Sequence, residues 1–166
     1  MIQAGERPPD LYGELRRLGV TAAALVLALT AAGCGAGGGR AALSHSCGAT
    51  DKSFIKTASI NMTALSLWAN GYRSGEIEPE DVVEQSYDAA KRVAYVKPND
   101  PSLREAQKLL DAMFREYGDA VKLKAKGKAS GRRMYRAYGL ASFAREVLLD
   151  AQPELAKQGC EVAPLL

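Results

Sequence analysis

The chain has 166 residues, and its 22 basic and 19 acidic residues leave a formal net charge of only +3. This length suits one domain with a buried core and flanking segments. The single histidine, His45, argues against catalytic triads with a histidine base, zinc sites with two histidines and the Glu-x-x-His pairs of di-iron bundles. Three cysteines are an odd number, so one of them needs an explanation other than a disulfide pair.

The first recognisable pattern is an apolar run behind two arginines. Arg16 and Arg17 precede the apolar residues 18–29, and the small residues 31–33 then lead to Cys34. A basic start, an apolar stretch of about 7–15 residues and small residues at the cut are the parts of a secretory signal. The stretch resembles the signal of bacterial lipoproteins, in which the cysteine after the cut carries a diacylglyceryl group. The resemblance implies that Cys34 begins the mature protein and anchors it on the outer side of the cell membrane through palmitate-type chains.

Other fates of this segment stay open. An uncleaved anchor is one alternative, although about 15 apolar residues are short for a bilayer that needs roughly 20. Cleavage by the ordinary peptidase, which would release a soluble secreted protein, is another. A buried core helix is disfavoured by the glycine-rich residues 35–39 that follow. We assign residues 1–33 to the signal peptide, with residues 1–14 as an extended n-region or a misassigned start.

Residues 34–50 are dominated by Gly, Ala and Ser and are expected to form a flexible tether. Residues 51–166 are expected to form the folded domain. If the protein is exported, Cys47 and Cys160 are expected to pair in the oxidising compartment, with two free thiols as the alternative. The two cysteines bracket the whole domain.

Helical patterns begin at the start of this domain. Apolar residues three and four apart predict a first helix over residues 52–72, with Asp51 as its N-cap. A second helix is predicted to begin at Pro79, among acids that suit the positive end of the helix dipole. Its apolar stripe is expected to consist of Val83, Tyr87, Ala90 and Ala94.

Two more helices follow the break at residues 97–101, which holds two prolines. The third is predicted over residues 103–121. The fourth is predicted to begin at about residue 132, after two glycines, and to end near Pro153, with one short extra turn before the end of the chain.

The chain shows no sustained alternation of Val, Ile and Thr, so the predicted class is all-α. Four helices with short connections favour an up-down-up-down four-helix bundle. In that topology the start of the first helix and the end of the fourth lie together, which is where Cys47 and Cys160 are placed. The aromatic residues of these helices are predicted to pack mostly in the core, with a partly open groove lined by tyrosines as the alternative; they are Trp68, Tyr72, Tyr87, Tyr95, Phe114, Tyr117, Tyr135, Tyr138 and Phe143.

The one asymmetric charge signal is a basic run between the third and fourth helices. It consists of Lys122, Lys124, Lys126, Lys128, Arg132, Arg133 and Arg136. One interpretation is internal pairing with the acids of the first connection, Glu76, Glu78, Glu80 and Asp81, or a solvated face. The other is an acidic partner, namely an anionic cell-wall polymer, lipid headgroups or a protein. Nucleic acid is disfavoured, because no stacking aromatics are interleaved with the basic residues.

No residue cluster predicts catalysis, a metal or a cofactor. The paired acids Glu80 with Glu84 and Glu116 with Asp119 have the spacing of one exposed helix face, where solvation is the ordinary role. The sequence therefore favours an exported, membrane-anchored lipoprotein whose bundle is a non-enzymatic binding or interaction module at the cell envelope. The alternative is an inhibitor or exclusion factor that docks on another envelope protein, and a hydrolase using carboxylates alone has the least support.

Overall fold

The computed structural model describes residues Ser46–Leu166. The predicted signal peptide, Cys34, most of the tether and His45 lie outside the described residues. The described part consists of four α-helices and one short 3₁₀ turn: α1 (Ala49–Ser74), α2 (Pro79–Tyr95), α3 (Pro101–Ala125), α4 (Gly131–Lys157) and η1 (Ala163–Leu165).

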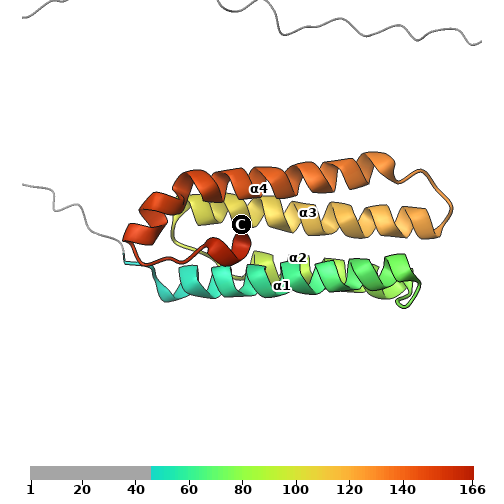
Figure 1. Cartoon of the computed structure of the whole chain (residues 1–166), viewed down its shortest axis with the longest axis horizontal. Coiled ribbons are helices and arrows are strands. Elements are labelled where there is room, and N and C mark those ends of the chain that lie inside the picture. Colours follow the sequence, from blue (N-terminus) through green and yellow to red (C-terminus); the bar gives the residue numbers. More distant parts are fainter. Residues whose placement is uncertain (1–45) are drawn as a thin grey trace, which may run out of the picture. The chain divides into compact units, whose positions relative to one another are not determined.

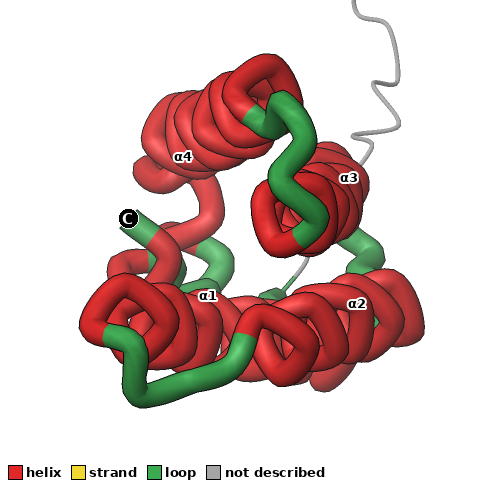
Figure 2. The backbone as a smooth tube through the Cα atoms, turned by 90° about the vertical axis from the view of Figure 1, so that its right-hand side faces the viewer, coloured by secondary structure: helices red, strands yellow, loops and turns green. Residues whose placement is uncertain are grey.

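The four helices form an all-α bundle in which successive helices run in opposite directions, as the sequence predicts (Figure 1). Viewed from the end, α1 and α2 form one layer, and α3 and α4 lie over it (Figure 2). α3 packs closely on both α2 and α4, and α1 packs on α2. By contrast, α1 and α4 make hardly any direct contact. The bundle is therefore closed on three sides and open on the fourth.

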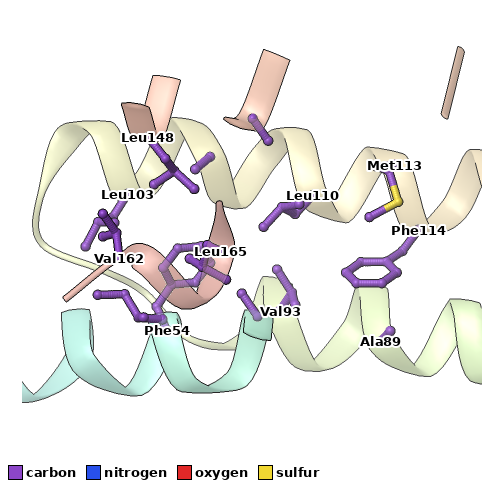
Figure 3. Close-up of a cluster of buried hydrophobic side chains, with 14 of the residues drawn as sticks. Phe54, Ala89, Val93, Leu103, Leu110, Met113, Phe114, Leu148, Val162 and Leu165 are labelled. Atoms are coloured by element: carbon purple, nitrogen blue, oxygen red, sulfur yellow. The ribbon is translucent and has the colours of Figure 1, made fainter. Parts of the chain in front are cut away.

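The core is continuous from the disulfide end of the bundle to its middle. Side chains from all four helices and from the C-terminal segment meet there (Figure 3). Phe54 of α1, Leu103 of α3 and Leu148 of α4 are fully buried, and Leu165 of η1 packs among them. Burial of one such side chain stabilises the fold by about 1.5–3 kcal/mol.

The interface between α2 and α3 depends on small and polar residues. A Cβ atom at Gly118 would lie only 3.1 Å from the Cβ of Ser86, so the glycine permits a close approach of the two helices. The buried Ser86 hydroxyl donates to its own helix at the carbonyl of Val82, 2.7 Å away. The predicted stripe of α2 is thus largely wrong: its buried face consists of Val82, Ser86, Ala89, Ala90 and Val93. Most of this face lies one residue before the prediction, because small side chains carry a weak hydropathy signal.

The start of α1 differs from the prediction. The helix begins at Ala49 with Gly48 as N-cap, and Asp51 lies inside the first turn. The Asp51 side chain is only 5% exposed. It accepts hydrogen bonds from the backbone N–H of Gly48 at 3.2 Å, of Asn99 at 2.6 Å and of Asp100 at 3.2 Å. Asp51 therefore joins the start of α1 to the connection between α2 and α3, instead of acting as the N-cap.

The two ends of the domain are fastened together. Cys47 and Cys160 form a disulfide with their Cα atoms 5.1 Å apart, and the N–H of Cys47 donates to the carbonyl of Gln158 at 2.7 Å. The pairing predicted from the sequence is thus present in the structure. Pro153 does not end α4, which continues to Lys157 and buries Leu155. An interior proline costs about 3 kcal/mol, from a lost hydrogen bond and a clash with the preceding turn, and burial of Leu155 offsets part of this cost.

Candidate functional site: an open groove between α1 and α4

A long groove occupies the open side of the bundle. It consists of two adjoining recesses with volumes of about 430 and 490 Å³. Met62, Ser66 and Ala141 line both recesses, so the two are continuous. Volumes of about 300–1,000 Å³ are usual for sites that bind small molecules.

The walls of the groove come from α1 and α4, and its floor comes from α3. Small side chains face one another across the opening, including Ser66 and Ala69 on α1 and Ala137 and Ala141 on α4. Packed helices need side chains that fill an interaxial distance of about 8–10 Å. These small residues are too short to fill the space where α1 and α4 are held apart.

The C-terminal segment keeps the two walls separate at the disulfide end. η1 lies between α1 and α4 in both views of the backbone (Figures 1 and 2). Leu165 is buried against the core, and it also lines the groove together with Leu110 and Leu148. The segment thus fills the gap at one end of the bundle, and the groove is the part of the gap that it leaves open.

The floor and walls are apolar and rich in flexible side chains. All three methionines of the described residues, Met62, Met113 and Met134, line the same recess. Methionine adapts its shape to irregular surfaces and is frequent in sites that accept varied apolar groups. Tyr72 and Tyr117 add aromatic surface to the lining.

Three tyrosines, Tyr72, Tyr117 and Tyr138, line one of the two recesses. Burial raises the pKa of Tyr117 above its ordinary value, and the neighbouring Tyr138 phenol adds to this rise. A tyrosine hydroxyl is a hydrogen-bond donor and acceptor, so Tyr117 adds a polar group to the lining of this recess. Tyr138 is 63% exposed at the edge of the same recess.

The charged side chains that line the groove are all basic. They are Arg73, Lys124 and Arg145, and neither recess has an acidic side chain in its lining. Lys124 lies over the ring of Tyr72, with its Nζ atom 5.4 Å from the ring centroid. Arg73 donates to the side-chain oxygen of Asn70, and Arg145 Nε donates to the carbonyl oxygen of Leu166 at 2.9 Å.

The basic run predicted from the sequence is divided among different surfaces. Lys124 lines the groove, whereas Lys122 and Lys126 line a recess beside α2 that also holds Glu80 and Glu84. Arg132, Arg133 and Arg136 line a third recess. The structure therefore does not bring the seven residues together at one recess.

The internal partners of the basic run are not the predicted ones. Arg133 pairs with Glu116 and Asp119 at 2.9 Å each, and Arg136 pairs with Glu116 at 3.0 Å. Within Ser46–Leu166 no ion pair joins the run to the acids of the α1–α2 connection, although Lys122 and Lys126 line one recess together with Glu80. The reason is geometric: Glu116 and Asp119 lie on α3, which packs directly on α4.

Glu116 and Asp119 are also less exposed than the sequence predicts. Both side chains are partly buried and are engaged by the two arginines. The Tyr87 hydroxyl donates to Asp119, and this hydrogen bond, with burial, raises the pKa of Tyr87 above its ordinary value. The pair thus joins α2, α3 and α4.

The core role predicted for the aromatic residues is wrong for four of them. Tyr95 is 85% exposed, Tyr135 83%, Tyr138 63% and Phe143 58%. Of the aromatic residues named in the sequence analysis, only Phe114 is fully buried. The alternative of a partly open groove describes Tyr72, Tyr117 and Tyr138 correctly. Helical spacing identified a shared face but not whether another helix covers it.

Comparisons with known proteins complete this description. No family model, curated protein or solved structure matches the chain. Among Ser46–Leu166, no group of three or more His, Cys, Asp or Glu side chains is arranged to hold a metal ion. None of the helices in this range is both long enough and apolar enough to cross a membrane. The candidate site is therefore defined by the groove alone.

Proposed function

We propose that the protein is an exported lipoprotein, anchored by lipid on Cys34, whose bundle is a non-enzymatic binding module at the cell envelope. The ligand site is the groove between α1 and α4. The resemblance of the first 34 residues to a lipoprotein signal supports the anchor. The open side of an otherwise closely packed bundle supports the binding role.

The observation that carries the binding role is the apolar character of this opening. Methionine and leucine side chains that face water cost about 25 cal/mol for each Å² of apolar surface left uncovered. Met62 and Leu65 lie only partly buried in the groove, although their neighbours Phe54 and Ala58 on the same helix are fully buried. An apolar ligand would cover this surface and recover that free energy.

The lining residues favour binding over catalysis. They supply no carboxylate, histidine or cysteine that could act as a general base or nucleophile. Tyr117 holds its proton more strongly than a free tyrosine. The groove is thus equipped to contact a ligand and not to transfer its protons.

Blocking the groove tests the binding role. Ser66 is exposed and lines both recesses, so Ser66→Phe places an aromatic ring in the groove without altering the core. Ser53→Phe is the matched control, because Ser53 is an exposed serine of α1 that lies outside the groove. A neutral dye that fluoresces in apolar surroundings should bind the wild type and Ser53→Phe, and its affinity for Ser66→Phe should fall about tenfold. Equal affinities for all three proteins would contradict the assignment of the groove.

The anchor has a separate test. Cells that express the full chain are grown with alkyne-labelled palmitate, and the protein is probed for the label. The wild type should be labelled and fractionate with membranes, whereas Cys34→Ser should carry no label. An unlabelled wild-type protein that keeps its first 33 residues would contradict the anchor.

The second candidate is docking on an acidic envelope polymer or on another envelope protein, as an inhibitor or exclusion factor would dock. It is favoured by exposed side chains outside the groove: the ring of Tyr135, and Lys128 and Arg132, which form no ion pair among the described residues. Tyrosine and arginine are frequent at protein interfaces. A pull-down from solubilised envelope would favour this candidate if one stoichiometric partner were lost on Arg132→Glu but retained on Ser66→Phe.

A further inference from the structure

We propose that the groove binds a single-chain amphiphile with an anionic headgroup. Its chain lies along α3 between α1 and α4, and its phosphate or carboxylate contacts Arg73 and Lys124. This inference rests on the proposed function, which assigns the ligand site to the groove. It adds the chemical class of the ligand and its direction in the site.

The charges of the lining select the headgroup. Arg73 is in the last turn of α1 and Lys124 is in the last turn of α3. The two helices run in the same direction, so both cations lie at the end of the groove away from the disulfide (Figure 1). Neither forms an ion pair with an acid of Ser46–Leu166: Arg73 bonds the neutral Asn70, and Lys124 lies over the Tyr72 ring. An anionic headgroup would supply the partner that each cation lacks.

The opposite end of the groove is unsuited to a headgroup. Leu165 and Leu166 line the recess there, and Arg145 is already engaged with the carbonyl oxygen of Leu166. Leu110 and Leu148 complete an apolar surface at this end. The end of the hydrocarbon chain therefore belongs there, and the headgroup belongs at Arg73 and Lys124.

The length of the groove suits one hydrocarbon chain. Its wall on α4 extends from Met134 to Leu148, which corresponds to about 20 Å at a rise of about 1.5 Å per residue. One leaflet of a bilayer has a hydrocarbon thickness of about 15 Å, half of the roughly 30 Å core. A chain of the length found in membrane lipids thus fits between the two ends. Ser66 and Ala141 line both recesses. Their side chains are short, so the middle of the groove stays open for the chain.

A purely structural role for the two cations makes a different prediction. Basic residues in the last turn of a helix offset its negative end, usually by about 0.3–1 kcal/mol. If this were their only role, reversing their charge would lower stability but would not change which ligand binds. The experiment therefore compares two ligands that differ only in charge.

The test uses the full-length protein in its own membranes. Two photoactivatable probes carry a diazirine in the same long alkyl chain, one as an alkyl phosphate and one as the uncharged alcohol. Labelled peptides are mapped by mass spectrometry, and only label that excess unmodified alkyl phosphate displaces is counted. The variant is Arg73→Glu with Lys124→Glu. The control, Arg92→Glu with Lys108→Glu, makes the same change in net charge at exposed residues outside the groove.

We expect the phosphate probe to label groove peptides of α1, α3 and α4 in the wild type and in the control. In the variant, which loses both cationic contacts, the ratio of phosphate to alcohol label should fall at least about tenfold, a factor that corresponds to about 1.4 kcal/mol. Equal ratios in variant and control would overturn the headgroup assignment but leave the groove as the ligand site. Failure of both probes to label the groove would overturn the proposed function too. Crosslinks from the groove to an amphipathic protein helix, with no displaceable lipid label, would overturn the amphiphile in favour of a protein partner.

Discussion

Asp51 offers the sharpest test of how the domain is held together. Its buried carboxylate accepts three backbone N–H groups, one before α1 and two from the connection that leads into α3. Asp51→Ala removes all three hydrogen bonds and changes no apolar contact. The substitution thus isolates the junction between two segments that are distant in the sequence.

The size of the effect follows from the three bonds. A hydrogen bond to a charged group contributes about 1.5–3 kcal/mol when it is buried. Asn99 is exposed, so in the variant water can replace part of the lost hydrogen bonding. We therefore take a contribution of about 1 kcal/mol for each of the three hydrogen bonds. We expect Asp51→Ala to lower the free energy of unfolding by about 3 kcal/mol, or Tm by about 12 °C for a domain of this size. Asp51→Asn should cost about 1–2 kcal/mol, since one side-chain oxygen stays available.

Urea unfolding followed by circular dichroism, with the disulfide intact, measures these differences. Asp81→Ala is the control, because Asp81 is an exposed acid in the first turn of α2. The control should lower stability by less than about 1 kcal/mol, the upper end of what an exposed acid in the first turn contributes through the helix dipole. If Asp51→Ala were within about 0.5 kcal/mol of the control, the bonds of Asp51 would not stabilise the fold.

Three further predictions concern stability. Cys47→Ala removes the disulfide, which closes a loop with a sequence separation of 113, and should lower the free energy of unfolding by about 5 kcal/mol in the chain-entropy model. A decrease of less than about 1 kcal/mol, measured by urea unfolding, would refute this prediction. The pKa of Tyr87 is raised by its bond to Asp119 and by burial, so its stabilisation is complete below the unfolded pKa of about 10 and is lost as pH rises through the folded pKa. The stability difference between wild type and Tyr87→Phe should therefore stay constant up to about pH 9 and shrink as pH rises above about 10, and a difference that does not change through that rise would contradict the linkage. Gly75 has a φ of +80°, so Gly75→Ala should lower the free energy of unfolding by about 1–2 kcal/mol. A Cβ atom at Gly139 would meet no other atom within 4 Å, so Gly139→Ala should raise the free energy of unfolding by about 0.5–1 kcal/mol. Thermal unfolding that shifts Tm in the same direction for both variants would contradict this prediction.

Local signals in the sequence were sufficient for the helices and for the ends of the domain. The two prolines of residues 97–101 predicted a break just before α3, and in the structure Asp100 caps that helix by accepting from the N–H of Ser102 and Leu103. Helix order alone placed Cys47 beside Cys160. These features depend on residues close in the chain or on topology, so periodicity and turn chemistry could identify them.

The groove could not be predicted in the same way. Spacing identifies the residues that share a helix face, and Met62 and Tyr117 have the spacing of core residues. Whether a face is covered depends on the distance between two helices that are remote in sequence. Here the C-terminal segment lies between α1 and α4, and its Leu165 lines the space that the two helices leave open. The small residues Ser66 and Ala141 were the available sign that the walls do not meet.

The bond partners of the arginines show the same limit. The basic run and the acids of the α1–α2 connection were predicted to lie at the same end of the bundle and therefore to pair. In the structure, Arg133 instead pairs with Glu116 and Asp119 of α3, the helix next to its own. Which of several acids an arginine reaches depends on helix rotation. That rotation is fixed by core packing, for example by the close approach of Gly118 to Ser86.

The disulfide fastens the two walls of the groove at one end of the bundle. Cys47 and Cys160 join the start of α1 to the end of α4, and within Ser46–Leu166 these two helices make hardly any direct contact of their own. At the other end, the width of the groove therefore depends on how α1 packs on α2 and how α4 packs on α3, so substitutions in those two interfaces would change the size of ligand that the groove accepts.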